Sequence, residues 1–345
     1  MTREISDFSR KLRTLTDRAF AESPGAKVQD LLIAGSFLLR IRFLSASLHQ
    51  ALLPAFSQIL SPDDSAGRTA DFTIDCWESS SVDLELPPWP FGEGDVQGGV
   101  VLPFDGVHGA YFSHESGAMS YLDASSGRGF FWLRHSGDLQ GYEKAAPLLQ
   151  IIHWTLGMRD VHVTHAAAVA TETGAALLVG KGGSGKSTSA ALCMEAGMHH
   201  LCDDYCLLSN KGTASVHPLY GTAKLHPRSL RLAPLRSWSE RSAWSSDEKS
   251  VVLLPSASFP PAPLRVILLP SVTGSGHASL RRASQGEALR ALAPSSLFQL
   301  KGGAAASFAL FSHLARTLPS YHLDLGSNPE TVAGRIREAI ETTSP

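Results

Sequence analysis

Eight consecutive residues decide the fold of this chain: Gly180-Lys181-Gly182-Gly183-Ser184-Gly185-Lys186-Ser187. They match the pattern G-x-x-x-x-G-K-[ST], in which glycines let backbone N–H groups approach the phosphates of a nucleotide. The apolar run Ala175–Val179 leads into the loop, and a run compatible with a helix leaves it. This order of strand, loop and helix is the setting that a P-loop requires. The alternative, a glycine-rich turn without a ligand, is disfavoured by these flanking elements.

The residue types in the loop predict a nucleoside triphosphate, either ATP or GTP, bound together with Mg²⁺. The N-terminus of the following helix adds partial positive charge where the phosphates would lie. Lys186 provides a mobile cation for the β- and γ-phosphates, and Ser187 provides a hydroxyl ligand for Mg²⁺. We therefore expect the nucleotide to contact the loop and the residue that follows it, Thr188.

Two adjacent carboxylates, Asp203 and Asp204, interrupt the apolar segment Leu201–Leu208. Charged residues are rarely buried unless they are paired or bind a metal, so the pair indicates a functional site. If the segment is one extended strand, the two side chains point to opposite faces and have different roles. One would act as a general base, and the other would bind Mg²⁺ or make a structural hydrogen bond. The alternative is a solvated β-turn.

His165 is a further candidate for the site. It lies in the segment Val161–Val169, where strand alternation places it on the face opposite His162. A single histidine in such a strand is more often a core residue than a catalytic one. Whether His165 is catalytic therefore depends on the motifs that accompany it in the sequence.

Composition and charge narrow the class of partner. The formal net charge is −2, from 30 Lys and Arg against 32 Asp and Glu, and the sequence has no long basic run. We therefore expect no nucleic-acid partner. The N-terminus lacks the apolar segment of a signal peptide, and the apolar run Leu31–Leu39 is too short to cross a bilayer. We expect a cytoplasmic protein that binds a small molecule, a peptide or another protein, and no membrane.

The chain is expected to be an α/β protein with two domains, because 345 residues suffice for two hydrophobic cores. An α+β domain over residues 1–155 would precede a P-loop domain with a mixed sheet over residues 156–345. In the first, periodicity predicts helices over 1–24 and 146–156, a strand over 31–37, and antiparallel strands over 110–112, 119–122 and 129–133. In the second it predicts strands over 161–169, 175–179, 201–208 and 264–269, and helices over 186–197 and 329–342.

The segment from His165 to Leu208 resembles the catalytic core of the bacterial HPr serine kinase/phosphorylase family, and in particular the HPr-kinase-like lasso-peptide kinases. It has, in the family's order, a histidine on a strand, the P-loop, a helix that ends at Gly197 and the Asp pair. The resemblance implies an HPr-kinase and PEP-carboxykinase type of fold for the second domain. It also implies a Mg²⁺-dependent P-loop serine kinase that phosphorylates a Ser or Thr hydroxyl of a peptide or protein, for example a ribosomal peptide precursor.

The same resemblance gives a role to each candidate residue. Asp203 takes the position of the family's proton acceptor, and His165 and Lys186 take the positions of its catalytic partners. Asp204 takes the position of the second carboxylate and is, beside Ser187, the candidate for binding Mg²⁺. HPr kinases form oligomers, so the resemblance also implies a homo-oligomer. The first domain resembles no part of the family, and its place suggests that it recognises the acceptor.

The sequence departs from the family pattern at three places, one of which is that the family's glycine-rich segment for binding HPr is not recognisable. Thr188 stands where HPr kinases carry Glu, and Val216–Arg231 contains no acidic residue where they carry a second Mg²⁺-binding Glu. Lys224, Arg228 and Arg231 lie there instead, and we expect at least one of them to contact the triphosphate or an anionic acceptor. These departures argue against HPr itself as the acceptor. A small-molecule kinase and a non-catalytic nucleotide-binding regulator are the alternative functions.

Overall fold

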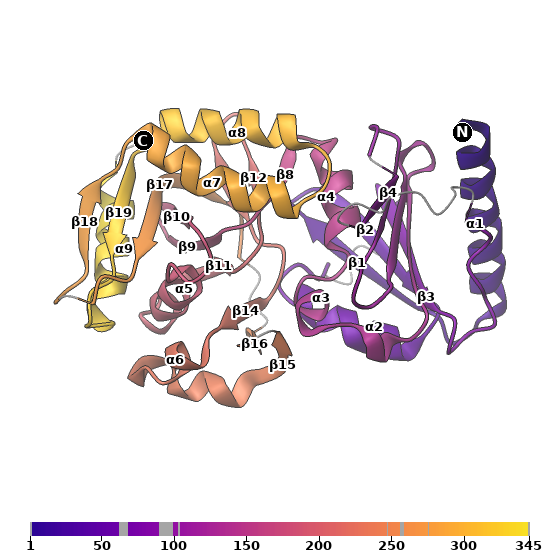
Figure 1. Cartoon of the computed structure of the whole chain (residues 1–345), viewed down its shortest axis with the longest axis horizontal. Helices are drawn as coiled ribbons and strands as arrows, with labels where there is room; N and C mark the ends of the chain where they lie inside the picture. Colours follow the sequence, from indigo (N-terminus) through magenta and orange to yellow (C-terminus); the bar gives the residue numbers. More distant parts are fainter. Residues whose placement is uncertain are drawn as a thin grey trace. The chain divides into compact units, whose positions relative to one another are not determined.

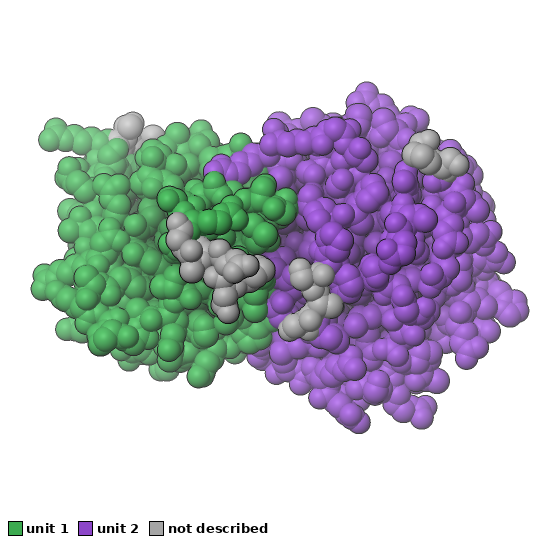
Figure 2. Space-filling view, turned by 180° about the vertical axis from the view of Figure 1, so that it is seen from behind, with its two compact units in different colours: residues 1–56, 60–158 green, residues 57–59, 159–345 purple. Residues whose placement is uncertain are grey.

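The computed structural model describes residues 2–61, 68–89, 99–102, 104–246, 248–255, 259–274 and 276–343. The chain divides into two compact units, which Figure 2 colours separately. Unit 1 comprises Met1–Phe56 and Leu60–Met158, and unit 2 comprises Ser57–Ile59 and Arg159–Pro345. Helices and mixed β-sheets make up both units, which confirms the expected α/β class. None of the helices in the described ranges is both long and apolar enough to cross a membrane.

Unit 1 is built on a seven-stranded sheet with the order β1-β2-β3-β7-β6-β5-β4. Its strands are β1 (Lys27–Ile33), β2 (Phe37–Phe43), β3 (Phe72–Glu78), β4 (Val100–Leu102), β5 (His108–Phe112), β6 (Met119–Asp123) and β7 (Arg128–Leu133). β3 pairs in parallel with β2 and β7, and the other pairs are antiparallel. The expected antiparallel arrangement of β5, β6 and β7 is thereby confirmed.

The prediction of a single strand over residues 31–37 is wrong, because a turn interrupts this segment. Residues 34–36 form this turn between β1 and β2. Ala34 and Gly35 have φ angles of 50° and 77°, the left-handed conformation that a tight hairpin needs at both central positions. The apolar residues on either side conceal this turn in the sequence, since both arms of the hairpin are hydrophobic.

Two helices cover opposite faces of the unit 1 sheet. α1 (Thr2–Glu22) buries Phe8 and Leu12 at helical spacing against sheet residues that include Tyr121. α4 (Leu149–Gly157) packs close to β7, where a Cβ on Gly129 would lie 2.8 Å from Cγ2 of Ile151. Two short helices, α2 (Ala46–Leu52) and α3 (Gly141–Ala145), complete the α-helices of this unit in its described part. The helix expected from residue 146 begins three residues later, at Leu149.

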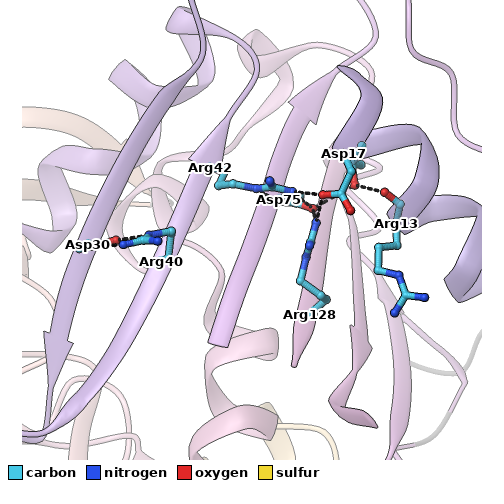
Figure 3. Close-up of polar contacts among 8 residues, drawn as sticks. Arg13, Asp17, Asp30, Arg40, Arg42, Asp75 and Arg128 are labelled. Carbon is cyan, nitrogen blue, oxygen red and sulfur yellow. Dashed lines mark hydrogen bonds and ion pairs between the residues drawn. The ribbon is translucent and has the colours of Figure 1, made fainter. Parts of the chain in front are cut away.

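A buried ion-pair network joins α1 to three strands of this sheet (Figure 3). Asp75 on β3 is 0% exposed, and its carboxylate accepts hydrogen bonds from Arg42 on β2, at 2.6 Å, and from Arg128 on β7. Asp17 on α1 accepts from the same two arginines, at 2.8 and 3.0 Å. Thr16 also donates to Asp75, at 3.0 Å. The network therefore fixes the position of α1 on the sheet by charge as well as by apolar packing.

Asp75→Asn is expected to lower the free energy of unfolding by about 3–5 kcal/mol, because it leaves two arginines without their buried counter-ion. Asp7→Asn is the control, because Asp7 pairs with Arg10 on the exposed side of α1, where an ion pair contributes about 0–1 kcal/mol. Urea titration of the full chain measures both changes. Losses of equal size in the two variants would contradict a special role for the network.

Unit 2 is built on nine strands, seven of which follow the order β11-β9-β10-β17-β13-β12-β8. β19 pairs with β17 and with β18. The strands are β8 (Val161–Thr164), β9 (Ala167–Thr171), β10 (Gly174–Leu178), β11 (His199–Cys202), β12 (Cys206–Ser209), β13 (Ser215–His217), β17 (Ala262–Ser271), β18 (Ser279–Arg282) and β19 (Ser320–Asp324). β10 and β19 both run parallel to β17, whereas β9 and β13 run antiparallel to their neighbours.

Two strands expected from the sequence are each divided in two. Residues 161–169 form β8 and β9 with a break at His165–Ala166, and residues 201–208 belong to β11 and β12 with a break at Asp203–Tyr205. β8 pairs with β12, and β9 pairs with β11, so the two breaks lie side by side. A continuous apolar run does not distinguish one long strand from two short ones that belong to different parts of a curved sheet.

Helices lie on both faces of this sheet (Figure 1). α5 (Lys186–Glu195) and α9 (Glu330–Thr342) pack on one face, in a core that includes Leu178, Val266 and Ile336. α7 (Gln285–Gln299) and α8 (Ala304–Thr317) cover the other face. The predicted helices over 186–197 and 329–342 are confirmed.

A small three-stranded sheet lies against α5, with the order β14-β16-β15. It comprises β14 (Thr222–Leu225), β15 (Ser242–Ser246) and β16 (Lys249–Leu253), with α6 (Pro227–Leu230) and a 3₁₀ helix (Ala233–Arg241) between β14 and β15. Leu225, Trp238 and Val252 bury their side chains in the same core as α5. This sheet is therefore held firmly beside the P-loop helix of unit 2.

His200 on β11 makes stability depend on pH. Its side chain is fully enclosed, and neither ring nitrogen has a partner within the described part of the chain. Burial lowers the pKa of His200 to about 4, whereas an unfolded histidine titrates near 6.5. The unfolded state thus binds a proton first, and stability is lost as the pH falls from above about 6.5 toward about 4.

His200→Leu is expected to remove about 3 kcal/mol of the stability loss that acidification from pH 7 to pH 4 causes in the wild type. The control is His277→Leu, because His277 is exposed. Urea titrations at several pH values give the slope for each variant. An unchanged slope in His200→Leu would show that other groups dominate acid unfolding.

Candidate active site

The P-loop connects β10 to α5 in the way that the sequence predicts. Gly185 is the N-cap of α5, with a φ of 105°, and Lys186 and Ser187 are the first two helical residues. The φ angle of Gly185 strains any other residue, and a Cβ there would also lie 2.2 Å from Cδ1 of Leu325, which would have to move. The loop therefore directs its backbone and the N-terminus of a ten-residue helix toward the same place.

Lys186 is buried within the loop and is 7% exposed. Its ammonium donates to the carbonyl oxygens of Gly180 at 2.7 Å and of Lys181 at 3.2 Å. Burial lowers the pKa of Lys186, while the charges of Asp203 and Asp204 act in the opposite direction. The ammonium is thus close to both aspartates, and the partners it has among the described residues are two neutral carbonyls, which an anionic ligand can replace.

The Asp pair is not in an extended strand. The expectation that strand alternation points the two side chains to opposite faces is therefore wrong. Asp203 and Asp204 lie in the break between β11 and β12, and Asp204 has a φ of 66°. The left-handed conformation of Asp204 turns the chain sharply, which an Asp tolerates better than most residues. The two carboxylates do have different surroundings, but the turn produces the difference.

Asp203 is a buried carboxylate with one oxygen that has no partner in the described ranges. It is 1% exposed, and its Oδ2 accepts the backbone N–H of Lys224 at 2.9 Å. Burial and the charge of Asp204 raise its pKa, against the effects of the Lys224 amide, Ser187 and Lys186. The structure therefore places Asp203 next to the Lys and the Ser that end the P-loop.

Asp204 is paired on both oxygens. The ammonium of Lys224 lies 2.6 Å from Oδ2, and Nε2 of His165 lies 3.0 Å from Oδ1. Burial by itself would raise the pKa of Asp204, but Lys224 and His165 together hold it well below its usual range. Asp204 therefore stays ionised.

His165 is positioned from three sides. Its ring contacts Asp204, its backbone N–H donates to Ser296 on α7 at 3.0 Å, and the Tyr205 ring lies 5.5 Å away at 62°. Tyr205 in turn donates to Gln299 on α7 at 3.2 Å. The break that contains the aspartates is thus fixed to α7 through a histidine and a tyrosine.

The side chains of His165, Lys186, Asp203 and Asp204 line one open cavity of about 630 Å³. It contains Gly182 to Thr188 of the loop region, both aspartates and His165, together with Lys224 and Arg228, two of the three cations that the sequence suggested for an anionic ligand. The lining residues that the sequence did not assign to the site are Tyr205, His226, Ser229, Leu232, Lys249, Val272, Gln299 and Leu325. The volume suits a nucleotide-sized ligand.

The structure brings together the catalytic candidates His165, Lys186, Asp203 and Asp204, which the sequence separates by up to 39 residues. Lys224 and Arg228 also line the cavity, whereas Arg231 does not. Gly180 and Lys181 contribute their carbonyls to the loop rather than lining the cavity. Thr188 bonds to Ser229 at 2.6 Å. Lys249 carries no signal in the sequence, because it lies on a strand 63 residues beyond the P-loop lysine.

Several polar atoms in this cavity lack partners among the described residues: Oδ1 of Asp203, Oγ of Ser184 and Nδ1 of His165. Buried polar groups are normally hydrogen-bonded, so these atoms are available to a ligand or to water in the cavity. No cluster of three or more His, Cys, Asp or Glu able to bind a metal occurs in the part of the chain that the structure describes. The oxygen donors of Ser187 and Asp203 nevertheless suit Mg²⁺, which commonly takes few protein ligands and completes its shell with phosphate and water.

Comparisons with known proteins add little to this geometry. No protein family model matches the chain, and no curated protein sequence matches it. A solved structure similar to this chain is that of the Hpr(Ser) kinase/phosphatase from Coxiella burnetii, at 10% sequence identity and a TM-score of 0.30. The similarity covers 51% of this chain and 95% of that one. A TM-score of this size carries no argument about function, which rests on the cavity itself.

Proposed function

We propose that this protein is a nucleoside-triphosphate-dependent and Mg²⁺-dependent kinase that phosphorylates a Ser or Thr hydroxyl of a peptide or protein. The observation that carries the proposal is the position of Asp203, a buried carboxylate with an unpaired oxygen, beside the lysine and the serine of a P-loop. A buried carboxylate with an unpaired oxygen can accept the proton of an acceptor hydroxyl, a step that a protein which only binds nucleotide does not carry out.

In this proposal the loop amides and Lys186 bind the triphosphate. The ammonium of Lys186 exchanges its two carbonyl contacts, at 2.7 and 3.2 Å, for phosphate oxygens. Such charge-assisted contacts neutralise the negative charge that moves during phosphoryl transfer. Because Lys186 is buried, water screens this charge less than it would at the surface.

Ser187 is the residue that would hold Mg²⁺, with the Asp203 carboxylate next to it. When bound, Mg²⁺ supplies positive charge to the phosphate oxygens and orients them. A direct metal role for Asp204, the expectation from the sequence, would require it to give up Lys224 or His165, which occupy its two oxygens. We therefore give Asp204 a positioning role.

Asp203 orients the acceptor hydroxyl and receives its proton. The hydroxyl oxygen forms a bond to the γ-phosphorus, the bond from that phosphorus to the β–γ bridging oxygen breaks, and the nucleoside diphosphate leaves. A carboxylate with a raised pKa is a better proton acceptor than one whose pKa is held low, which favours Asp203 over Asp204.

The segment between β11 and β12 is held in position by contacts among Asp204, His165 and Lys224. Lys224 bonds to Asp204 through its ammonium and to Asp203 through its backbone amide. One residue therefore fixes the distance between the two carboxylates. We further propose that unit 1 recognises the acceptor, since appended domains commonly set specificity while the P-loop core performs the chemistry.

Lys186→Ala is expected to reduce phosphoryl transfer by at least about 10²-fold, because it removes a buried cation from the transferring group. The measurement is transfer of label from γ-labelled ATP or GTP to a degenerate Ser and Thr peptide library, together with release of labelled phosphate. Lys211→Ala is the control, because Lys211 is exposed and does not line the cavity. Unchanged transfer in Lys186→Ala would mean that the site is assigned wrongly.

Asp203→Asn and Asp204→Asn are expected to fail in different ways. Asp203→Asn should keep nucleotide affinity and lose about 10²–10⁴-fold in kcat, the usual contribution of acid–base catalysis. Asp204→Asn should lower the free energy of unfolding by about 3–5 kcal/mol, because it leaves Lys224 without its buried partner. The double variant Asp204→Asn/Lys224→Met should regain part of that stability.

The two effects are measured by single-turnover transfer and by urea titration of the same proteins. Wild-type turnover in Asp203→Asn with no turnover in Asp204→Asn would reverse the roles of the two residues. Wild-type turnover in both would contradict the kinase itself. A Mg²⁺ requirement that shifts in Asp204→Asn but not in Asp203→Asn would restore Asp204 as the metal ligand.

A further inference from the structure

We propose that the segment from Lys224 to Ser229, together with Lys249, forms a second cationic wall of the triphosphate site, in which Arg228 binds the nucleoside-proximal phosphate and Lys249 binds the γ-phosphate. The inference rests on the proposed function and identifies which residues outside the P-loop bind its nucleotide. The P-loop would bind the triphosphate from one side, and this second wall, built on β14, α6 and β16, would bind it from the other. We call the two together the clamp.

The wall is fixed to the P-loop region at both of its ends. At one end the backbone N–H of Lys224 donates to Oδ2 of Asp203 at 2.9 Å. At the other end Oγ of Ser229 lies 2.6 Å from Oγ1 of Thr188 on α5. The packing of Leu225 into the core beneath α5 holds the middle of the segment. The wall therefore lies at a set distance from the loop before any ligand binds.

The two ends of the wall, one beside Asp203 and the other beside Thr188, determine in which direction the triphosphate lies along it. The γ-phosphate must lie near Asp203, because the acceptor hydroxyl attacks there in the proposed reaction. The nucleoside-proximal phosphate then lies toward the opposite end of the wall, where Ser229 meets Thr188. Arg228 precedes Ser229 in the chain, so it belongs to that second end.

Two cations of this wall have no anionic partner in the described part of the chain. Arg228 and Lys249 both line the cavity, and no ion pair involves either of them, whereas Lys224 is paired with Asp204. Lys249 also lies beside the first residues of this segment, because Val251 pairs with Lys224 and Ser250 pairs with Leu225. Like charges held together without a counter-ion disfavour the empty site, and a polyanion relieves this cost.

The geometry also separates this wall from an ordinary solvated basic surface. Arg228 and Arg231 are both exposed, but only Arg228 lines the cavity. Lys249 is half-buried at the first position of β16, where the sheet meets the cavity. Arg231→Gln and Lys211→Gln are therefore matched controls, since each removes a cation of the same type outside the proposed clamp.

The test measures binding of ATP, ADP and AMP with Mg²⁺ by calorimetry, and the guanine series in parallel. Lys249→Gln is expected to weaken ATP binding by about 10- to 100-fold and leave ADP and AMP within about threefold, because a charge-assisted contact is lost only at the γ-phosphate. Arg228→Gln is expected to weaken all three nucleotides by a similar factor of about 10 or more. Lys249→Arg should restore ATP binding, which excludes misfolding as the cause.

Each outcome bears on the clamp. Equal losses for ATP and ADP in Lys249→Gln would overturn the γ-phosphate position, and wild-type affinities in both variants would overturn the clamp while the proposed function stands. Losses of the same size in Arg231→Gln and Lys211→Gln would show a general effect of net charge and also overturn it. If the wild-type protein binds neither series, both the clamp and the proposed function fail.

Discussion

The site depends on one constraint, which is that two strand breaks lie side by side next to the start of the P-loop. β9 pairs with β10 so that Ala167 is opposite Leu178, which places His165–Ala166 beside the residues that enter the loop. β11 pairs with β9, and β12 pairs with β8, so the break at Asp203–Tyr205 must lie at the same level. The hydrogen-bond register of these short strands therefore determines that a histidine and two aspartates meet a phosphate-binding loop.

The charges around the two aspartates then give them different roles. The two aspartates are neighbours in sequence, yet Lys224 and His165 neutralise Asp204 while Asp203 keeps an unpaired oxygen. Burial of both would be costly if neither were paired, so the pairing of one permits the other to offer an oxygen to a ligand. A single backbone turn at Asp204 produces this asymmetry, because it directs the second carboxylate away from the first.

The chain also contains charged residues of two kinds elsewhere, those held in ion pairs and those without an ion pair among the described residues. In unit 1, Asp75 and Asp17 each pair with both Arg42 and Arg128, and the network holds a helix on a sheet (Figure 3). Around the unit 2 cavity, by contrast, Arg228 and Lys249 have no ion pair in the described ranges. Paired charges stabilise the fold, while charges left without a partner in a cavity indicate where an anionic ligand binds.

The sequence by itself determined the P-loop, the α/β class and the identity of His165, Lys186, Asp203 and Asp204 as candidates. Glycines at this spacing are what a phosphate-binding loop requires, and carboxylates rarely occur in an apolar segment without a partner or a ligand. The sequence could not reveal the breaks within residues 161–169 and 201–208, or the hairpin turn at residues 34–36, since apolar runs look alike whether or not the chain turns within them. Only the tertiary structure decided that Lys224 pairs with Asp204 and that Lys249 reaches the cavity. Those contacts join residues from separate sheets, and local periodicity carries no information about the distance between them.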